Sequence, residues 1–432
     1  MASEKKAKNQ GFTAPKGMRD IVGDQYYLYQ GFFEKAQEIA IYYGFTPIET
    51  PILEQEDVFT ASIGVGTDAI DKEMYSLKTK GGDHLALRPE HTAGAMRAYI
   101  EQGMQSLPQP VMLYNYGPSF RHDNPQRGRY RQFYQFDVDV FGSDKSIVDA
   151  LVIKTAVTIL EEAGAKNLVV HINSIGDKES RTQYLRELVS YYKKNLSGLA
   201  PIDRERLKTN PMRILDSKEA KTKEINQNAP DAISFLTPQA KKHFKEVIEY
   251  LDSMEITYVI DKNLVRGLSY YTHTVFEIME ENPHDENEPL TLAGGGRYDY
   301  LGRVLGSKKD VPAMGMAIGV DRVIESSWYK KLCPRILKKP KMYFIQLGFE
   351  AKLKSLSIIE ILRKAHVPIA QSLSKDSLGS QLGIAEKIGV PYALIFGQKE
   401  ALDNTVIVRN MATRSQETIK LDKLLEYIKE LK

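Results

Sequence analysis

Residues 113–142, LYNYGPSFRHDNPQRGRYRQFYQFDVDVFG, concentrate side chains that could do chemistry. An apolar strand leads into a loop with Arg121, Arg127, Arg129 and Arg131, whose guanidinium groups can form paired hydrogen bonds to phosphate oxygens. An aromatic strand then returns toward Asp137 and Asp139. Phe133 could stack on a base, and Gln135 with Asp139 could hold a small cation. The hairpin predicts a site for a nucleotide beside an amine; the alternative is an exposed basic hairpin over a core strand.

This stretch resembles motif 2 of the class II aminoacyl-tRNA synthetases, in the form found in histidyl-tRNA synthetases. The resemblance implies that Arg121 binds the α-phosphate of ATP, Asp123 the adenine amino group, and Phe133 the adenine ring, with Arg129 among the ATP-binding residues. It also implies Mg²⁺ bridging the phosphates, with no metal ligand from the protein. By position in the loop, Asn124 and Gln126 are candidates for contact with the acceptor end of tRNA.

A second segment, LVRGLSYYTHTVFE, is similar to the LVRGLDYY segment of the same family, with Ser269 where the family usually has Asp. The resemblance implies that Arg266 neutralises the reacting carboxylate and α-phosphate, and that Tyr270 and Tyr271 line an imidazole pocket. Read as a strand, the segment would direct only one of the two tyrosines into that pocket, and we expect Tyr271 to be that residue. Without the resemblance, both tyrosines would be read as core residues.

LALRPEHTAGAMRAYI places Glu90 and Thr92 at the start of a helix. The family pattern implies that Glu90 binds the substrate's α-ammonium together with Gln135 and Asp139, because carboxylates accept charge-assisted hydrogen bonds. Thr92 is assigned to the same histidine site. The alternative for Glu90 is an acidic residue favoured by the helix dipole, and the alternative for Thr92 is a helix cap. In AGGGRYDYL, Tyr298 follows three glycines that permit close backbone approach to a ligand and is assigned to the histidine site.

MGMAIGVDRVI resembles motif 3 of the class II enzymes and places Arg322 on a helix, where it would bind the γ-phosphate. Asp321 stands where the class usually has Glu. Together the motifs imply attack of the histidine carboxylate on the α-phosphorus, with release of pyrophosphate, and then transfer of histidine to tRNA(His). Because the nucleophile is already an anion, catalysis would consist of positioning and charge neutralisation by Arg121, Arg266 and Mg²⁺.

The composition is that of an ordinary globular protein: 432 residues, 42% hydrophobic, 27% charged, net charge +3. We expect a cytoplasmic protein without a membrane span, because no apolar run approaches roughly 18 residues and the N-terminus lacks a secretory signal. Cys333 is the one cysteine, which excludes an intrachain disulfide and a multi-Cys zinc site.

From Lys338 onward the chain has 16 Lys/Arg against 10 Asp/Glu. This basic end predicts a contact with nucleic acid, and a solvated basic face is the alternative. Strands alternating with helices indicate an α/β layer there. The segment resembles the anticodon-binding domain of several class II synthetases, with Lys399, Glu400 and Arg409 at strand ends as candidate tRNA contacts or ordinary surface charges.

The expected organisation is a disordered tail (1–12), an α+β catalytic domain with an antiparallel sheet (13–337) and an α/β anticodon-binding domain (338–432). A helical insertion is expected at about 178–255. Helices are expected from Asp24 to Tyr43 and over 147–163, ended by Gly44 and Gly164. FTPIETPILE would form an edge strand because of its prolines, and its likeness to motif 1 implies a homodimer.

The resemblance covers the chain from Lys16 onward and implies ATP-dependent ligation of L-histidine to tRNA(His). The alternatives are a regulatory synthetase-like subunit of ATP phosphoribosyltransferase, another class II synthetase, and an RNA-binding module without catalysis.

Overall fold

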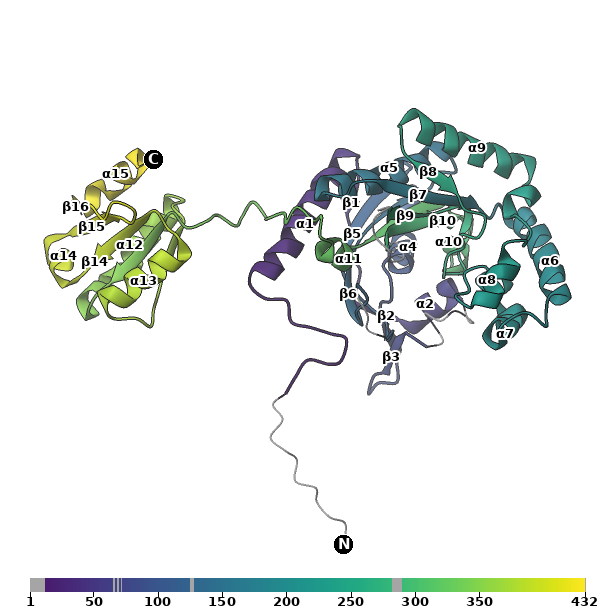
Figure 1. The fold of residues 1–432 in the computed structure, drawn as a ribbon, viewed down its shortest axis with the longest axis horizontal. Coiled ribbons are helices and arrows are strands. Elements are labelled where there is room, and N and C mark those ends of the chain that lie inside the picture. The colour runs from purple at the N-terminus through teal and green to yellow at the C-terminus, as the bar shows by residue number, and fades with distance from the viewer. Residues whose placement is uncertain are drawn as a thin grey trace, which may run out of the picture. The chain divides into compact units, whose positions relative to one another are not determined.

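The computed structural model describes residues 12–431 except 65–66, 68–69, 71, 125–127 and 282–289. The predicted tail therefore lies almost entirely outside the described residues. The chain divides into two compact units, one ending at Pro334 and the other beginning at Arg335 (Figure 1).

Helices and strands of the first unit follow the class II expectation of a sheet flanked by helices. The helices are α1 (Asp24–Tyr42), α2 (Glu56–Ile63), α4 (Thr92–Glu101), α5 (Ser146–Ala163), α6 (Lys178–Lys194), α7 (Pro201–Thr209), α8 (Ala220–Asn226), α9 (Pro238–Ser253), α10 (Leu301–Val304) and α11 (Val320–Glu325). The strands are β1 (Thr46–Pro47), β2 (Leu53–Gln55), β3 (Tyr75–Lys78), β4 (His84–Leu87), β5 (Val111–Phe120), β6 (Gln132–Phe141), β7 (Leu168–Ser174), β8 (Tyr258–Ile260), β9 (Thr272–Glu280), β10 (Thr291–Arg297) and β11 (Ala313–Gly319).

The main sheet has eight strands in the order β1-β5-β6-β11-β10-β9-β7-β8. Its outermost pairs, β1 with β5 and β7 with β8, are parallel, and the strands between them are antiparallel. The proline-containing β1 lies at the edge, as predicted, where a missing N–H costs no ladder hydrogen bond. The antiparallel sheet confirms the predicted fold class.

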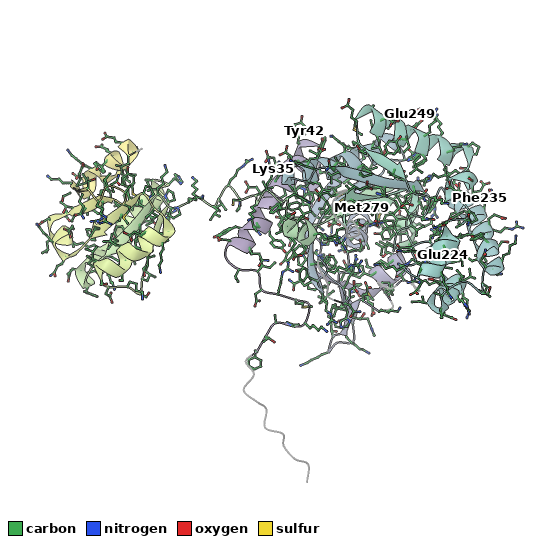
Figure 2. All side chains as sticks on the ribbon, in the orientation of Figure 1. Lys35, Tyr42, Glu224, Phe235, Glu249 and Met279 are labelled. Carbon is green, nitrogen blue, oxygen red and sulfur yellow. The ribbon has the colours of Figure 1, made fainter. Side chains whose placement is uncertain are left out.

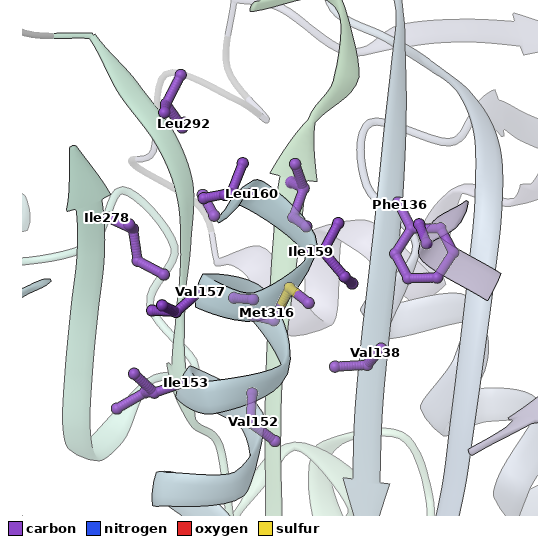
Figure 3. Close-up of a cluster of buried hydrophobic side chains, with 14 of the residues drawn as sticks. Phe136, Val138, Val152, Ile153, Val157, Ile159, Leu160, Ile278, Leu292 and Met316 are labelled. Carbon is purple, nitrogen blue, oxygen red and sulfur yellow. The ribbon is translucent and has the colours of Figure 1, made fainter. Parts of the chain in front are cut away.

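Helix α5 covers one face of the sheet and supplies much of its core (Figure 3). Its Val152, Ile153 and Leu160 are fully buried against strand residues such as Phe136 and Val138. The helix ends where predicted, because Gly164 has φ 118° and its N–H bonds back to the carbonyls of the last turn. Burial of whole aliphatic side chains stabilises this layer by about 1.5–3 kcal/mol each.

Helix α1 begins at Asp24, and Gly23 rather than Asp24 is the capping position. Gly44, with φ 92°, ends the helix as predicted. The inner side of α1 packs into the core, whereas Tyr42 at its end is 85% exposed and points outward (Figure 2).

Helices α6 to α9 lie between Lys178 and Ser253, the range in which a helical insertion was expected. Asp177 caps α6 by accepting a hydrogen bond from the N–H of Ser180 at 2.8 Å, and Thr237 caps α9. The hydroxyl of Thr237 also donates to the Asp177 carboxylate at 2.6 Å, so the two helix starts are joined directly.

A small sheet of β2, β4 and β3 was not predicted. Most residues of β3 are exposed, so the strand lacks the alternation of apolar and polar residues that would indicate it in the sequence.

The second unit has a five-stranded sheet in the order β13-β12-β14-β15-β16, with a parallel core as predicted. Its elements are β12 (Met342–Gln346), α12 (Phe349–Lys364), β13 (Ile369–Gln371), α13 (Leu378–Ile388), β14 (Tyr392–Phe396), α14 (Gln398–Asp403), β15 (Thr405–Asn410), β16 (Gln416–Lys420) and α15 (Leu424–Glu430). Helix α14 and the exposed edge strand β16 were missed.

Helices in the described residues are all too short or too polar to cross a membrane.

Candidate active site

One face of β6 organises the candidate site. Side chains alternate across a strand, so Phe133, Gln135, Asp137 and Asp139 share one face. Phe136 and Val138 point the other way into the core. Because β6 pairs with β5 and β11 along its length, this face has a fixed register. An aromatic ring, an amide and two carboxylates therefore follow one another along a single rigid strand.

Arginines gather near the Phe133 end of this face. The guanidinium carbon of Arg121 lies 5.2 Å from the centre of the Phe133 ring, and its Nε donates to the carbonyl of Pro89 at 2.9 Å. Arg322 on α11 donates to the carbonyls of Thr291 at 2.5 Å and Gly128 at 3.3 Å. These backbone contacts hold both guanidinium groups in fixed orientations.

Positive charge is crowded at this end of the site. Burial lowers the pKa of Arg322, and the nearby guanidinium groups of Arg129, Arg121 and Arg266 lower it further, against an opposing effect of Glu277. Mutually repelling cations fixed in a partly buried site are stabilised by a bound polyanion. Phosphate groups have the charge and the acceptor oxygens that such a cluster binds.

Asp123 sits at the start of the motif 2 loop. Its carboxylate accepts a hydrogen bond from the backbone N–H of Asn124 at 2.6 Å and lies 3.3 Å from the guanidinium of Arg129. The predicted tRNA contact Asn124 is an exposed residue of the same loop, whereas Gln126 and Arg127 lie outside the described residues.

Carboxylates gather at the other end of the β6 face. Asp139 accepts hydrogen bonds from the hydroxyl of Tyr298 and, at 3.3 Å, from that of Thr92. Burial raises the pKa of Asp139 to about 8, and neighbouring Asp137 and Glu90 add to this increase while the hydroxyl of Tyr298 opposes it. A buried acidic group of this kind is stabilised as a carboxylate by a bound cation.

Glu90 has the features of both interpretations made from the sequence, an acidic residue at a helix start and a carboxylate in the substrate site. Its two carboxylate oxygens accept hydrogen bonds from the N–H groups of Thr92 at 2.7 Å and Ala93 at 2.8 Å, at the start of α4. It is also buried beside Asp137 and Asp139, and burial raises its pKa. The helix start therefore orients a carboxylate inside the acidic cluster.

Tyr270 and Tyr271 lie together, contrary to the prediction that only one would face the pocket. Their ring centres are 4.7 Å apart, and the Tyr270 ring is 5.6 Å from that of Tyr298. The prediction was wrong because Tyr270 lies in a turn and β9 begins only at Thr272, so strand alternation does not apply.

Arg266 joins the two ends of the site. Its guanidinium pairs with Glu277 on β9 and lies 5.7 Å from the centre of the Tyr271 ring. Its Nε is buried without a hydrogen-bond partner among the described residues, as is Oε1 of Gln135. Glu277 was missed from the sequence, although it is the inward carboxylate of the strand THTVFEIME.

Two glycines make room for charged groups. A Cβ on Gly315 of β11 would lie 2.3 Å from Oδ1 of Asp139, and one on Gly294 of β10 would lie 2.5 Å from Nη1 of Arg266. Larger residues would therefore displace the Asp139 carboxylate or the Arg266 guanidinium.

The candidate tRNA contacts of the second unit lie close to where they were expected. Lys399 and Glu400 follow β14 but belong to α14, and Glu400 accepts a hydrogen bond from the N–H of Gly397 at 3.0 Å. Arg409 lies within β15 rather than after it, paired with Ala393 and Gln416 of the adjacent strands. Glu400 therefore has a structural role in its own helix.

Comparisons with known proteins identify the family of this chain. The family description "Histidyl-tRNA synthetase" matches residues 17–323, and "Anticodon binding domain" matches residues 341–431. The histidine–tRNA ligase of Desulforamulus reducens is 37% identical over 96% of this chain and 99% of its own length, and that of Pelotomaculum thermopropionicum is 38% identical over 97% of each. The crystal structure of apo histidyl-tRNA synthetase from S. aureus has a TM-score of 0.80 at 32% identity, covering 97% of this chain and 100% of that one. The chain belongs to the histidyl-tRNA synthetase family.

Proposed function

We propose that this chain ligates L-histidine to tRNA(His) at the expense of ATP, through a histidyl-adenylate. The observation that carries the proposal is the juxtaposition, along one face of β6, of a crowded arginine cluster and a buried carboxylate cluster. The first suits a triphosphate and the second suits an ammonium group. Arg266 lies between them, where the carboxylate of an amino acid would meet the α-phosphate.

In the first step, a carboxylate oxygen of histidine forms a bond to the α-phosphorus of ATP, and the bond from that phosphorus to the bridging oxygen of pyrophosphate breaks. Arg121 and Arg266 neutralise charge at the reacting groups, and Arg322 holds the γ-phosphate. Phe133 stacks on adenine and Asp123 accepts from its amino group, with Arg129 beside it. Mg²⁺ would be held mainly by phosphate oxygens and water, and it would neutralise further charge on the leaving pyrophosphate.

Histidine is held at both of its ends. Glu90, Gln135 and Asp139 accept hydrogen bonds from the α-ammonium, with Thr92 and Tyr298 orienting the Asp139 carboxylate. Tyr270 and Tyr271 provide hydroxyl partners for the imidazole nitrogens. A buried site built with polar partners discriminates against apolar side chains, because these would leave the partners unpaired.

In the second step, a terminal ribose hydroxyl of tRNA attacks the histidyl carbonyl, and AMP leaves. We assign tRNA contacts to Asn124 and Gln126 in the first unit and to Lys399, Glu400 and Arg409 in the second. The proposed boundaries are 13–337 for the catalytic domain, with the insertion at about 178–255, and 338–432 for the anticodon-binding domain. We infer a cytoplasmic location, because tRNA is used there.

We also infer a homodimer. Ile41, Tyr42, Ile52 and Leu53, at the end of α1 and around β2, are apolar and exposed in the single chain. Large apolar side chains that are exposed on a single chain are candidates for burial at an interface. Analytical ultracentrifugation would give twice the chain mass for the dimer, and a monomer at micromolar concentration would contradict the inference.

Amino-acid-dependent exchange of pyrophosphate into ATP, measured without tRNA for all twenty amino acids, tests the proposed function. Exchange with histidine alone is the expected result. Absence of exchange from a folded protein would favour the regulatory subunit or the RNA-binding module, and exchange with another amino acid would favour a different class II synthetase.

A further inference from the structure

A buried pair without an assigned role lies beside the carboxylate cluster. His91 immediately precedes α4, and Asp137 lies on β6; their exposed fractions are 0% and 2%. Nδ1 of His91 is 2.8 Å from Oδ2 of Asp137. The contact is a close pairing rather than an aligned hydrogen bond, because these two atoms have no hydrogen-bond partner of suitable geometry among the described residues.

The pair adjoins the groups assigned to the substrate ammonium. His91 follows Glu90 in the sequence, and Asp137 stands between Gln135 and Asp139 on the same face of β6. Asp137 raises the pKa of both Glu90 and Asp139, whereas His91 lowers the pKa of Glu90. Three buried carboxylates repel one another, and a partner for Asp137 reduces the tendency of the other two to take up protons.

A permanently charged group near Asp137, Arg88, has its hydrogen bonds directed elsewhere. The guanidinium of Arg88 donates to the carbonyls of Pro118 and Thr50, each at 2.9 Å, and so braces β5 against the preceding segment. His91 is the group in close contact with the carboxylate itself. An imidazole can balance a carboxylate as an imidazolium or by donating one ring N–H.

We propose that His91 is a positioning residue for histidine binding: it balances Asp137, so that Glu90 and Asp139 meet the substrate ammonium as carboxylates. This inference rests on the proposed function and deepens it. His91 does not touch the reacting atoms, so its effect falls on histidine binding and not on ATP binding or on the rate of adenylation. A purely structural role for His91 would instead disturb both substrates together.

Pyrophosphate exchange by the full-length protein, with histidine and ATP varied in turn, tests the inference in four variants. These are the wild type, His91→Phe, Asp137→Asn and the double variant. His91→Phe leaves Asp137 without its partner, and we expect the KM for histidine to rise about tenfold while kcat and the KM for ATP stay within about twofold. Asp137→Asn removes the unbalanced charge, so in that background His91→Phe has little further effect.

Val138→Ala supplies a matched control, because Val138 adjoins Asp137 but faces the core. It should lower the melting temperature without changing either KM. If His91→Phe is poorly folded, His91→Asn should show the same selective rise in the KM for histidine.

An unchanged KM for histidine in His91→Phe would overturn the inference, as would parallel rises in both KM values. A large rise in the KM for histidine in Asp137→Asn alone would also overturn it, because Asp137 would then bind the ammonium directly. If the wild type shows no exchange with histidine, the proposed function fails and this inference with it.

Discussion

The two units bury polar groups of different kinds. The first unit encloses charged side chains, including Glu90, Asp139 and Arg297, whereas the second, among its described residues, buries only the neutral Gln346, Ser355 and Gln381. Hydrogen bonds link those three: Ser355 donates to Oε1 of Gln346 at 2.7 Å, and Gln381 donates to the Gln346 carbonyl at 2.9 Å. All three side chains therefore have hydrogen-bond partners within the second unit.

Buried charge in the first unit is only partly satisfied by its own contacts. Arg297 is paired with Asp149 at 2.7 Å and serves the fold, but burial raises the pKa of Asp139, and Nε of Arg266 is without a hydrogen bond among the described residues. Such groups cost free energy of folding unless a ligand completes them. The difference supports the proposal that adenylation takes place in the first unit and that surface groups of the second unit recognise RNA.

Arg266→Ala should have the largest effect. Loss of this guanidinium removes charge neutralisation between the amino-acid carboxylate and the α-phosphate, so histidine-dependent exchange should fall at least about 10³-fold, or ~4 kcal/mol in the barrier. Removing Arg266 also leaves Glu277 unpaired, and Glu277→Gln, which keeps the arginine, should cost much less. Turnover near the wild-type rate in Arg266→Ala would contradict the role proposed for this arginine in adenylation.

Deleting the chain from Lys338 onward tests directly whether the two units have separate roles. We expect the charging of tRNA to fall by at least about 10²-fold, whereas exchange without tRNA should stay within a few-fold, because loss of polar RNA contacts weakens tRNA binding alone. Parallel measurement of both reactions checks this. Equal losses in the two reactions would mean that the second unit supports the structure of the first.

Asp139→Asn should change the dependence of stability on pH. The pKa of Asp139 is raised from 3.8 to about 8, so between these values the folded protein retains a proton that the unfolded chain has released. Stability of the wild type should therefore decrease as pH rises through this window, and this contribution should be absent from the variant. Melting temperatures at pH 5 and pH 8 give the comparison.

Saturating histidine should restore wild-type stability at pH 8, since an ammonium group favours the Asp139 carboxylate. If wild type and variant lose the same stability between pH 5 and pH 8, the pKa of Asp139 is not raised by its burial in the folded protein.

Arg181→Gln should have a smaller, selective effect from outside the site. Arg181 on α6 donates to the carbonyls of Ser269 at 3.2 Å and Tyr271 at 3.4 Å, and so fixes the segment that carries the two tyrosines. We expect the KM for histidine to rise about threefold to tenfold, with the KM for ATP unchanged, because each lost hydrogen bond is worth roughly 1 kcal/mol. Arg186→Gln, an exposed arginine of the same helix, is the control. If both variants behave alike, the insertion does not order the pocket.

The sequence predicted the elements whose ends are marked by local chemistry. Helix α5 was located closely because Gly164 ends it in a conformation that glycine adopts readily. Strand β16 was missed because most of its residues are exposed, and its pairing with β15 depends on contacts across the fold. Hydrophobic patterns along a sequence indicate which residues are buried. An exposed edge strand buries few residues and therefore shows little hydrophobic pattern.

The candidate site was predicted in its residue types but not in its contacts. Alternation along β6 was visible, yet Asp137 received no role, because its partner His91 comes from a different element. Glu277 was missed for the same reason, since the turn that brings Arg266 back onto β9 cannot be read from spacing alone. The family resemblance supplied roles for the residues proposed to contact substrate. Only the fold revealed the residues that contact and position those groups.

Matched cap substitutions in the two units give the smallest predicted effect and the finest test of their independence. The Ser377 hydroxyl accepts from the N–H of Ser380 at 3.3 Å at the start of α13, and that of Thr237 accepts from Ala240 at the same distance on α9. Each change to Ala should cost about 1 kcal/mol. Calorimetry should show Ser377→Ala lowering the unfolding transition of the second unit by about 4–8 °C, without any change in histidine-dependent exchange. Thr237→Ala should instead lower the transition of the first unit, because each unit has its own hydrophobic core. A single transition shifted equally by both substitutions would mean that the two units unfold together. They would then form one cooperative structure, despite the difference between their buried polar groups.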